Sequence, residues 1–140
     1  KLYNLGITTL RFFKKTTKSL QIKKNILTLQ YKFVIMNIEF EDKALEELYT
    51  QGSTVDGKYR KLSKDVVKQY IKVVNFIRAA RRIEDLYYIK SLHYEKKKGD
   101  LNGVDAVWIN KQYRLLFNSS ENEEGIVVNA LLFEISKHYE

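Results

Sequence analysis

Hydrophobic residues recur with two different periods along the chain, and these periods predict an ordered set of strands and helices. Ile38 and Phe40 alternate with polar neighbours, which predicts a short strand over Asn37–Phe40. Asp42 is a good N-cap, and apolar residues at helical spacing follow it until Gly52, a residue that suits a helix end. A first helix is therefore expected between these two residues.

A second helix has the broadest apolar stripe in the sequence. Ser63 is a suitable N-cap, and Asp65 lies near the positive end of the helix dipole. Apolar side chains then recur from Val66 to Ala80, with charged and amide side chains on the other side. This pattern predicts a helix that runs to about Arg82.

The last part of the chain has the pattern of strands. After a polar connection over His93–Gly103, three strand-like runs follow: Val104–Ile109, Tyr113–Asn118 and Ile126–Ile135. The connections between them are short, which implies antiparallel neighbours. Helices followed by strands predict an α+β fold.

Charge divides the 140-residue chain at Met36. Residues 1–35 carry eight of the 25 basic residues and no Asp or Glu, so the net charge of +8 belongs to them. Because the sequence begins with Lys, we interpret residues 1–35 as a basic extension, either upstream sequence read in frame or disordered, and 36–140 as the folded domain. An organelle transit peptide is the alternative, whereas polar residues interrupt the only candidate for a secretory signal core, Ile26–Ile35.

Within residues 36–140 the positive charge is concentrated in the middle. The segment Lys58–Lys98 has 13 basic and four acidic residues, and the segments around it are acidic. One positive face of this kind suits a phosphate backbone. The alternative is a set of lysines that only solvates a helix and a loop.

Several chemistries are disfavoured by the composition. Without cysteine there is no thiolate nucleophile or Cys zinc site, and two histidines are few for a transition metal. Nucleotide-binding fingerprints and windows of 18 apolar residues do not occur. We therefore expect no metal, no cofactor and no membrane span. The notable residue is Arg114 in mid-strand, which either needs partners in a core or lies in a cleft where it can clamp a phosphate.

Two segments together resemble a known family. Leu92–Gly103 and Val107–Phe117 strongly resemble the RelE/ParE toxin superfamily, whose pattern is E-x-L-K-G-D-x-x-G followed by I-N-x-x-[WY]-R-[IL]-x-F. Lys97 stands where the first pattern has Leu. The branch that they resemble is the HigB-like, or plasmid maintenance killer, toxins of type II toxin–antitoxin systems. The resemblance covers about Met36–Glu140.

The resemblance implies a RelE-like α+β fold in which two N-terminal helices pack on one face of a small twisted antiparallel sheet. The opposite face would bind RNA. It further implies a bacterial cytoplasmic endoribonuclease that cuts mRNA on the ribosome, by attack of a 2′-OH on its own phosphate and without a metal. A helix-turn-helix, HigA-like antitoxin would block the cleft and bind promoter DNA.

The resemblance also assigns candidate catalytic residues. Arg114 and Lys98 correspond to the family's phosphate-binding cations, and Glu95 stands where some relatives have His. His138 and Tyr139 correspond to the C-terminal acid or base and stacking residue, although many relatives have them in the reverse order. The structural alternatives are an Arg114 paired with a carboxylate such as Glu134, a solvated Lys98, a Glu95 in a loop ion pair, and a frayed C-terminus.

Four further residues are candidates for RNA binding: His93, Lys96, Lys97 and Tyr113. Tyr113 and Trp108 are expected in the core or in the cleft lining. Two other functions stay open on these residues. The same fold can act as a ParE-like gyrase inhibitor, or as an inactive relic that only binds the antitoxin.

Overall fold

The computed structural model describes residues 18–25, 36–124 and 126–138. The chain divides into two compact units, Lys1–Val34 and Ile35–Glu140. In the first unit, residues 18–25 form a helix with exposed side chains. Among the described residues, no helix is long and apolar enough to cross a membrane. The division lies beside the predicted boundary, and the origin of residues 1–35 stays a prediction.

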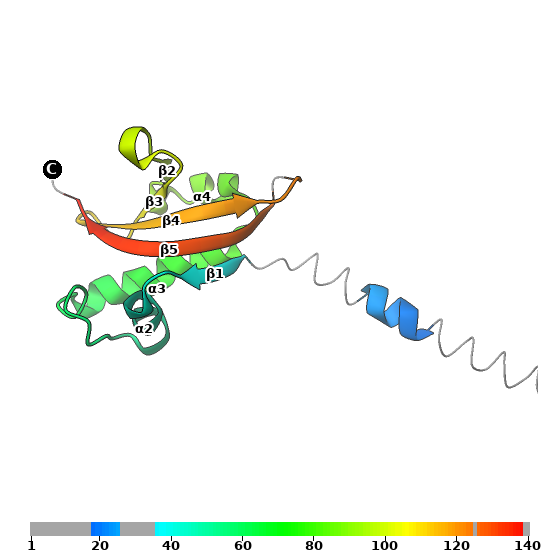
Figure 1. Cartoon of the computed structure of the whole chain (residues 1–140), viewed down its shortest axis with the longest axis horizontal. Helices are drawn as coiled ribbons and strands as arrows, with labels where there is room; N and C mark the ends of the chain where they lie inside the picture. Colours follow the sequence, from blue (N-terminus) through cyan, green and yellow to red (C-terminus); the bar gives the residue numbers. More distant parts are fainter. Residues whose placement is uncertain (1–17, 26–35, 125, 139–140) are drawn as a thin grey trace, which may run out of the picture. The chain divides into compact units, whose positions relative to one another are not determined.

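The second unit contains a five-stranded sheet in the order β1-β5-β4-β3-β2 (Figure 1). The strands are β1 (Asn37–Phe40), β2 (Glu95–Lys96), β3 (Asp105–Trp108), β4 (Tyr113–Glu121) and β5 (Val127–Lys137). The predicted antiparallel meander is confirmed by β3, β4 and β5, and β2 adds an antiparallel edge. The opposite edge is β1, which pairs in parallel with β5. The sheet is therefore mixed within the expected α+β class.

Both predicted helices are present. Helix α2 (Lys43–Gln51) begins where Asp42 accepts the Ala44 N–H at 2.8 Å, and it ends at Gly52, whose φ of 73° is left-handed. Helix α3 (Lys64–Ala79) begins at Ser63, which accepts the Val66 N–H at 3.3 Å. These caps are the ones that the sequence predicts.

Helix α3 ends earlier than the apolar pattern suggests, because a third helix begins close behind it. Ala80 is already extended. The Asp85 carboxylate then accepts the backbone N–H groups of Arg81 at 2.9 Å and Arg82 at 3.0 Å. These bonds stabilise the start of α4 (Ile83–Tyr88), which is followed by the 3-10 turn η1 (Lys90–Leu92).

The core lies between the helices and one face of the sheet. Figure 1 shows α2 and α3 on one side of β4 and β5. Tyr70 of α3 is fully buried, and its hydroxyl donates to the Leu45 carbonyl at 2.9 Å. Leu115 and Phe117 of β4 supply the sheet side of the same core. Because side chains alternate along a strand, Leu116, which lies between them, points to the other face.

Candidate functional site

Strand register places Arg114 on the face of the sheet opposite the core. Trp108 of β3 pairs with Arg114 of β4, and Arg114 pairs with Ser136 of β5. The flanking pair Val107 and Leu115 belongs to the core cluster. Because neighbouring residues in a strand point to opposite faces, the row from Trp108 to Ser136 lies on the face opposite the core. We call it the helix-free face, because α2 and α3 pack on the core side.

The Arg114 side chain is fixed by its own turn. Only 5% of the residue is exposed. Its Nη1 donates to the carbonyl oxygens of Asn110 at 2.8 Å, Lys111 at 3.2 Å and Tyr113 at 3.3 Å. The carboxylate suggested as its alternative partner, Glu134, forms an ion pair with Lys58 at 3.3 Å. Three backbone carbonyl oxygens are thus among the partners that hold this buried cation.

Trp108 connects this cation to His93. The guanidinium carbon of Arg114 lies 3.9 Å from the Trp108 ring centroid. The His93 ring also stacks on Trp108, with ring centroids 3.9 Å apart and planes inclined by 27°. His93 reaches this position because it ends η1 in the left-handed conformation, at φ 42°. The sequence interpretation places Trp108 only in the core or cleft lining, so it misses the contact with Arg114.

His138 continues the ladder at the C-terminal end of β5. Its N–H donates to the Gln112 carbonyl at 2.7 Å, one step beyond the pair Tyr113 and Lys137. Alternation along this extended segment places His138 on the same face as Ser136. The exposed His138 and the buried Arg114 therefore belong to one end of the helix-free face. Tyr139 lies outside the described residues.

The connection between β2 and β3 carries Lys98. This exposed residue precedes the 3-10 turn η2 (Gly99–Leu101), and Gly99 has a positive φ of 72°. In Figure 1 the η2 segment lies next to β2, at the edge of the sheet opposite β1. Glu95 pairs in register with Ala106, on the face that carries Trp108, and its carboxylate forms an ion pair with Lys97. Among the catalytic candidates, Glu95 is thus in the loop ion pair that the sequence interpretation names as its alternative.

Lys96 lies on the core face of the sheet, opposite to Glu95, and it has a buried partner. Its Nζ lies 3.3 Å from Asp105, which has no exposed surface. The Asp105 carboxylate also accepts the Tyr94 hydroxyl at 2.6 Å and the Ser119 hydroxyl at 2.6 Å. Burial, followed by the bond to Asp105, raises the pKa of the Tyr94 phenol. This network, Asp105 with its three partners, joins β2, β3 and β4.

Tyr113 is separated from the other RNA-binding candidates. It packs against the core cluster on the helix side, one residue away from Arg114. His93 is on the helix-free side through its contact with Trp108. The structure thus brings His93, Trp108 and Arg114 together and leaves Tyr113 across the sheet from them.

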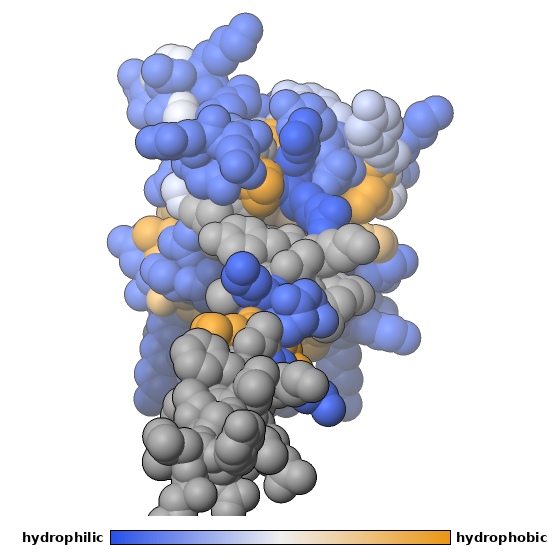
Figure 2. Space-filling view, turned by 90° about the vertical axis from the view of Figure 1, so that its right-hand side faces the viewer, coloured by the Kyte–Doolittle hydropathy of each residue, from blue (hydrophilic) through white to orange (hydrophobic). Residues whose placement is uncertain are grey.

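The face of the molecule drawn in Figure 2 is mainly hydrophilic over its described residues. In Figure 2 the coloured atoms are mostly blue, with small separate orange patches. The exposed large apolar side chains include Val55 on the α2–α3 connection and Tyr87 and Tyr88 on α4. Within the described part of the chain, no group of three or more His, Asp or Glu residues is arranged to hold a metal ion.

Comparison with known families gives the identification. The family model described as "RelE-like toxin of type II toxin-antitoxin system HigB" matches residues 38–133. The chain belongs to the HigB-like toxin family. Toxin HigB-1 of Vibrio cholerae serotype O1 is 29% identical over 97 residues, which cover 69% of this chain and 95% of that protein. The match begins within β1, beside the predicted domain boundary.

Solved structures of related toxins are also similar to this HigB-like protein. A YoeB/ParE toxin from Agrobacterium tumefaciens has a TM-score of 0.45 at 12% identity, over 74% of this chain and 100% of that chain. The YoeB dimer from Staphylococcus aureus has a TM-score of 0.43 at 19% identity, over 75% of this chain and 99% of that chain. A YoeB–YefM complex from the same organism has a TM-score of 0.41 at 18% identity, over 74% and 98%.

Proposed function

We propose that this HigB-like toxin is an mRNA endoribonuclease that acts on the ribosome in the bacterial cytoplasm. A cognate antitoxin of the HigA-like, helix-turn-helix type holds it inactive and carries the complex to promoter DNA. Family membership supports the toxin role and the existence of an antitoxin. The nuclease activity is supported by the arrangement of side chains on the helix-free face.

The reaction needs three kinds of group around one phosphodiester. A base takes the proton of the 2′-OH, a cation stabilises the charge on the phosphate oxygens, and an acid protonates the 5′ leaving oxygen. We assign the cation to Arg114 and a second cation to Lys98. His138 supplies the acid or the base, because an imidazole can exchange a proton near neutral pH. The products are a 2′,3′-cyclic phosphate and a 5′-OH.

The observation that carries this proposal is the fixed position of Arg114. Three backbone carbonyls and the Trp108 ring hold its guanidinium on the sheet face that the helices leave open. A cation held before substrate arrives loses little entropy when it meets the phosphate charge of the transition state. His138 enters the same end of this face through the Gln112 bond.

Glu95 and Tyr139 have secondary places in the proposal. The Glu95–Lys97 pair is half-exposed at the edge of the face, where the carboxylate is available as an alternative base. Tyr139 follows His138 directly in the sequence, and we propose that it stacks on a base next to the cleaved bond. Lys96 is expected to contribute less to RNA binding than Lys97, since its ammonium pairs with Asp105.

Replacement of Arg114 tests the proposal. We expect Arg114→Ala to abolish growth arrest and message cleavage, with a loss of at least about a hundredfold in rate, because the transition-state charge loses its cation. Cleavage is measured by primer extension in a translation extract. Arg60→Ala, which removes an exposed arginine from the α2–α3 connection, is the matched control and keeps full activity.

The same experiment separates the alternatives. A ParE-like inhibitor would leave message intact and change DNA supercoiling by gyrase, and a relic would do neither. Circular dichroism of Arg114→Ala must show a folded protein, since the carbonyls that the guanidinium satisfies become unpaired. Wild-type message cleavage by folded Arg114→Ala would refute the site assignment.

A further inference from the structure

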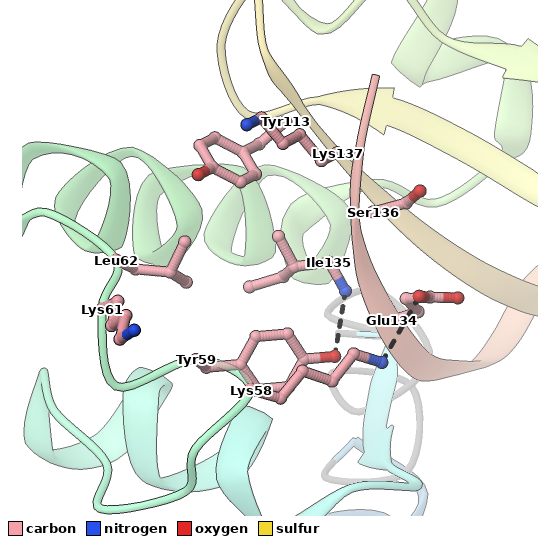
Figure 3. A pocket seen from close by; sticks show the side chains of 9 residues that line it. All are labelled: Lys58, Tyr59, Lys61, Leu62, Tyr113, Glu134, Ile135, Ser136 and Lys137. Carbon is pink, nitrogen blue, oxygen red and sulfur yellow. Dashed lines mark hydrogen bonds and ion pairs between the residues drawn. The ribbon is translucent and has the colours of Figure 1, made fainter. Parts of the chain in front are cut away.

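A separate hollow of about 410 Å³ lies between the α2–α3 connection and the ends of β4 and β5. We call it the basic pocket. Its apolar lining consists of Tyr59, Leu62, Tyr113 and Ile135. Figure 3 shows the two tyrosine rings on opposite sides of the hollow, with Leu62 and Ile135 between them. The Ile135 N–H donates to the Tyr59 hydroxyl at 3.4 Å, which holds that ring against β5.

The rim of the basic pocket is positively charged. It carries Lys58, Lys61 and Lys137 against one carboxylate, Glu134. Lys58 pairs with Glu134 at 3.3 Å and lies 5.2 Å from the Tyr59 ring centroid. Cations at the rim favour an anion, and aromatic walls favour a flat ring. A ligand that satisfies both parts of the pocket is an aromatic anion.

The basic pocket and the helix-free face meet at the same end of the sheet. Tyr113 and Lys137 form one register pair and line the pocket together with Ser136, and Ser136 pairs with Arg114 at the next register position. His138 directly follows Lys137. The pocket therefore borders the end of the sheet that carries Arg114.

We propose that the basic pocket binds a nucleotide of the RNA strand next to the cleaved one, with its base against the half-buried Tyr113 ring and its phosphate on the lysines. The volume is in the range of small-ligand pockets. An acidic peptide would use the rim but leave the aromatic walls unused, so a nucleotide fits the whole lining better. This inference rests on the proposed nuclease function, which it extends to a second subsite.

Charge reversal at the rim tests the assignment. The pocket variant is Lys61→Glu/Lys137→Glu, and the matched control is Lys68→Glu/Lys72→Glu on exposed positions of α3. The probe is a short 2′-O-methyl oligoribonucleotide, which 2′-OH attack cannot cleave, and its affinity for the full chain is measured by fluorescence anisotropy at several salt concentrations. We expect the pocket variant to bind roughly tenfold more weakly, with a salt slope lower by about 0.7 for each lost phosphate contact. The control should change affinity by less than the pocket variant does.

A second measurement examines the aromatic part of the pocket. Adenosine 5′-monophosphate should shift the amide resonances of Ile135 and Lys137 more than inorganic phosphate does at equal concentration. Equal affinities of the two double variants, or shifts from a polyglutamate peptide where the nucleotide gives none, would overturn the proposal. Binding to an uncleavable probe is independent of catalysis. If the wild-type chain did not cleave message but bound the probe through the pocket, only the nuclease proposal would be rejected. If it cleaved message but the pocket variant bound the probe as well as the control does, only the subsite would be rejected.

Discussion

At the residue scale, Trp108 is the side chain that gives Arg114 its place. Strand pairing puts the two residues opposite each other, and the indole face covers the guanidinium at 3.9 Å. A desolvated cation–π contact of this kind contributes about 2 kcal/mol. His93 stacks on the same tryptophan, so the orientation of Arg114 depends on a contact that reaches η1.

Replacement of Trp108 should therefore affect activity through Arg114. We expect Trp108→Ala to lower the free energy of unfolding by about 2 kcal/mol and message cleavage by roughly tenfold or more. Trp108→Phe keeps an aromatic face and should retain most of both. Urea unfolding is followed by circular dichroism, because Trp108 is the only tryptophan. Full cleavage activity in Trp108→Ala would show that Arg114 needs no such support.

At the residue scale, the sequence predicts the importance of Arg114 but not the contacts that hold Arg114 and Lys96. Arg114 is recognisable from sequence, since a charge in mid-strand needs partners or a cleft. Its contact with Trp108 has a weaker signal: the two residues are equally distant from Lys111, at the centre of the turn. Lys96 gives no such signal, because its partner Asp105 is identified only by burial and by the register of β2 against β3.

At the element scale, the Asp105 network holds the short edge strand β2 to β3 and β4. Two residues are too few for a strand that depends on backbone pairing alone. The carboxylate adds bonds from Tyr94, Lys96 and Ser119, which come from both neighbouring segments. The position of the following η2 segment with Lys98 therefore depends on a buried charge that is fully hydrogen-bonded.

Removal of this carboxylate should destabilise the sheet. We expect Asp105→Ala to lower the free energy of unfolding by about 3 kcal/mol, because it leaves the Tyr94 and Ser119 hydroxyls without their acceptor. Asp105→Asn keeps one acceptor oxygen and should cost less. Asp100→Ala in the exposed η2 turn is the control, with an effect below about 0.5 kcal/mol. If urea unfolding gave equal values for the variants at positions 105 and 100, the network would have no structural role.

The helices and the meander show why some elements are easy to predict. Caps and apolar periodicity are local, and they place α2, α3 and the three main strands close to their observed positions. Helix α4 is too short for periodicity, and it depends on two hydrogen bonds to Asp85. Strand β1 is predicted as a strand, but its parallel partner β5 is far away in the sequence.

At the scale of the whole molecule, the toxin fold belongs to the second unit, Ile35–Glu140. Met36 is 1% exposed, and its N–H donates to the Arg78 carbonyl at 3.1 Å. The family match starts at residue 38. We propose that the folded domain begins at Met36, next to β1.

A shortened chain tests this division. We expect a protein that begins at Met36 to unfold at the same temperature as the full chain, within about 2 °C, and to arrest growth equally. A chain that begins at Glu41 lacks β1 and should unfold at a clearly lower temperature, because the parallel pairs with β5 are lost. Aggregation or loss of growth arrest in the Met36 protein would show that residues 1–35 contribute to the domain.

The sequence by itself determined the order of β1, α2, α3 and the three meander strands, the helix caps, the α+β class and the family, because these depend on local periodicity and on two short motifs. It also identified Arg114 as a mid-strand charge that needs either partners in the core or a place in a cleft. Only the tertiary structure decided that β1 joins the sheet in parallel, that Asp105 and Trp108 hold Lys96 and Arg114, and that a basic pocket lies beside the site. These features come from strand register and burial between segments distant in the chain, and the physical interactions that set them exist only after the chain has folded.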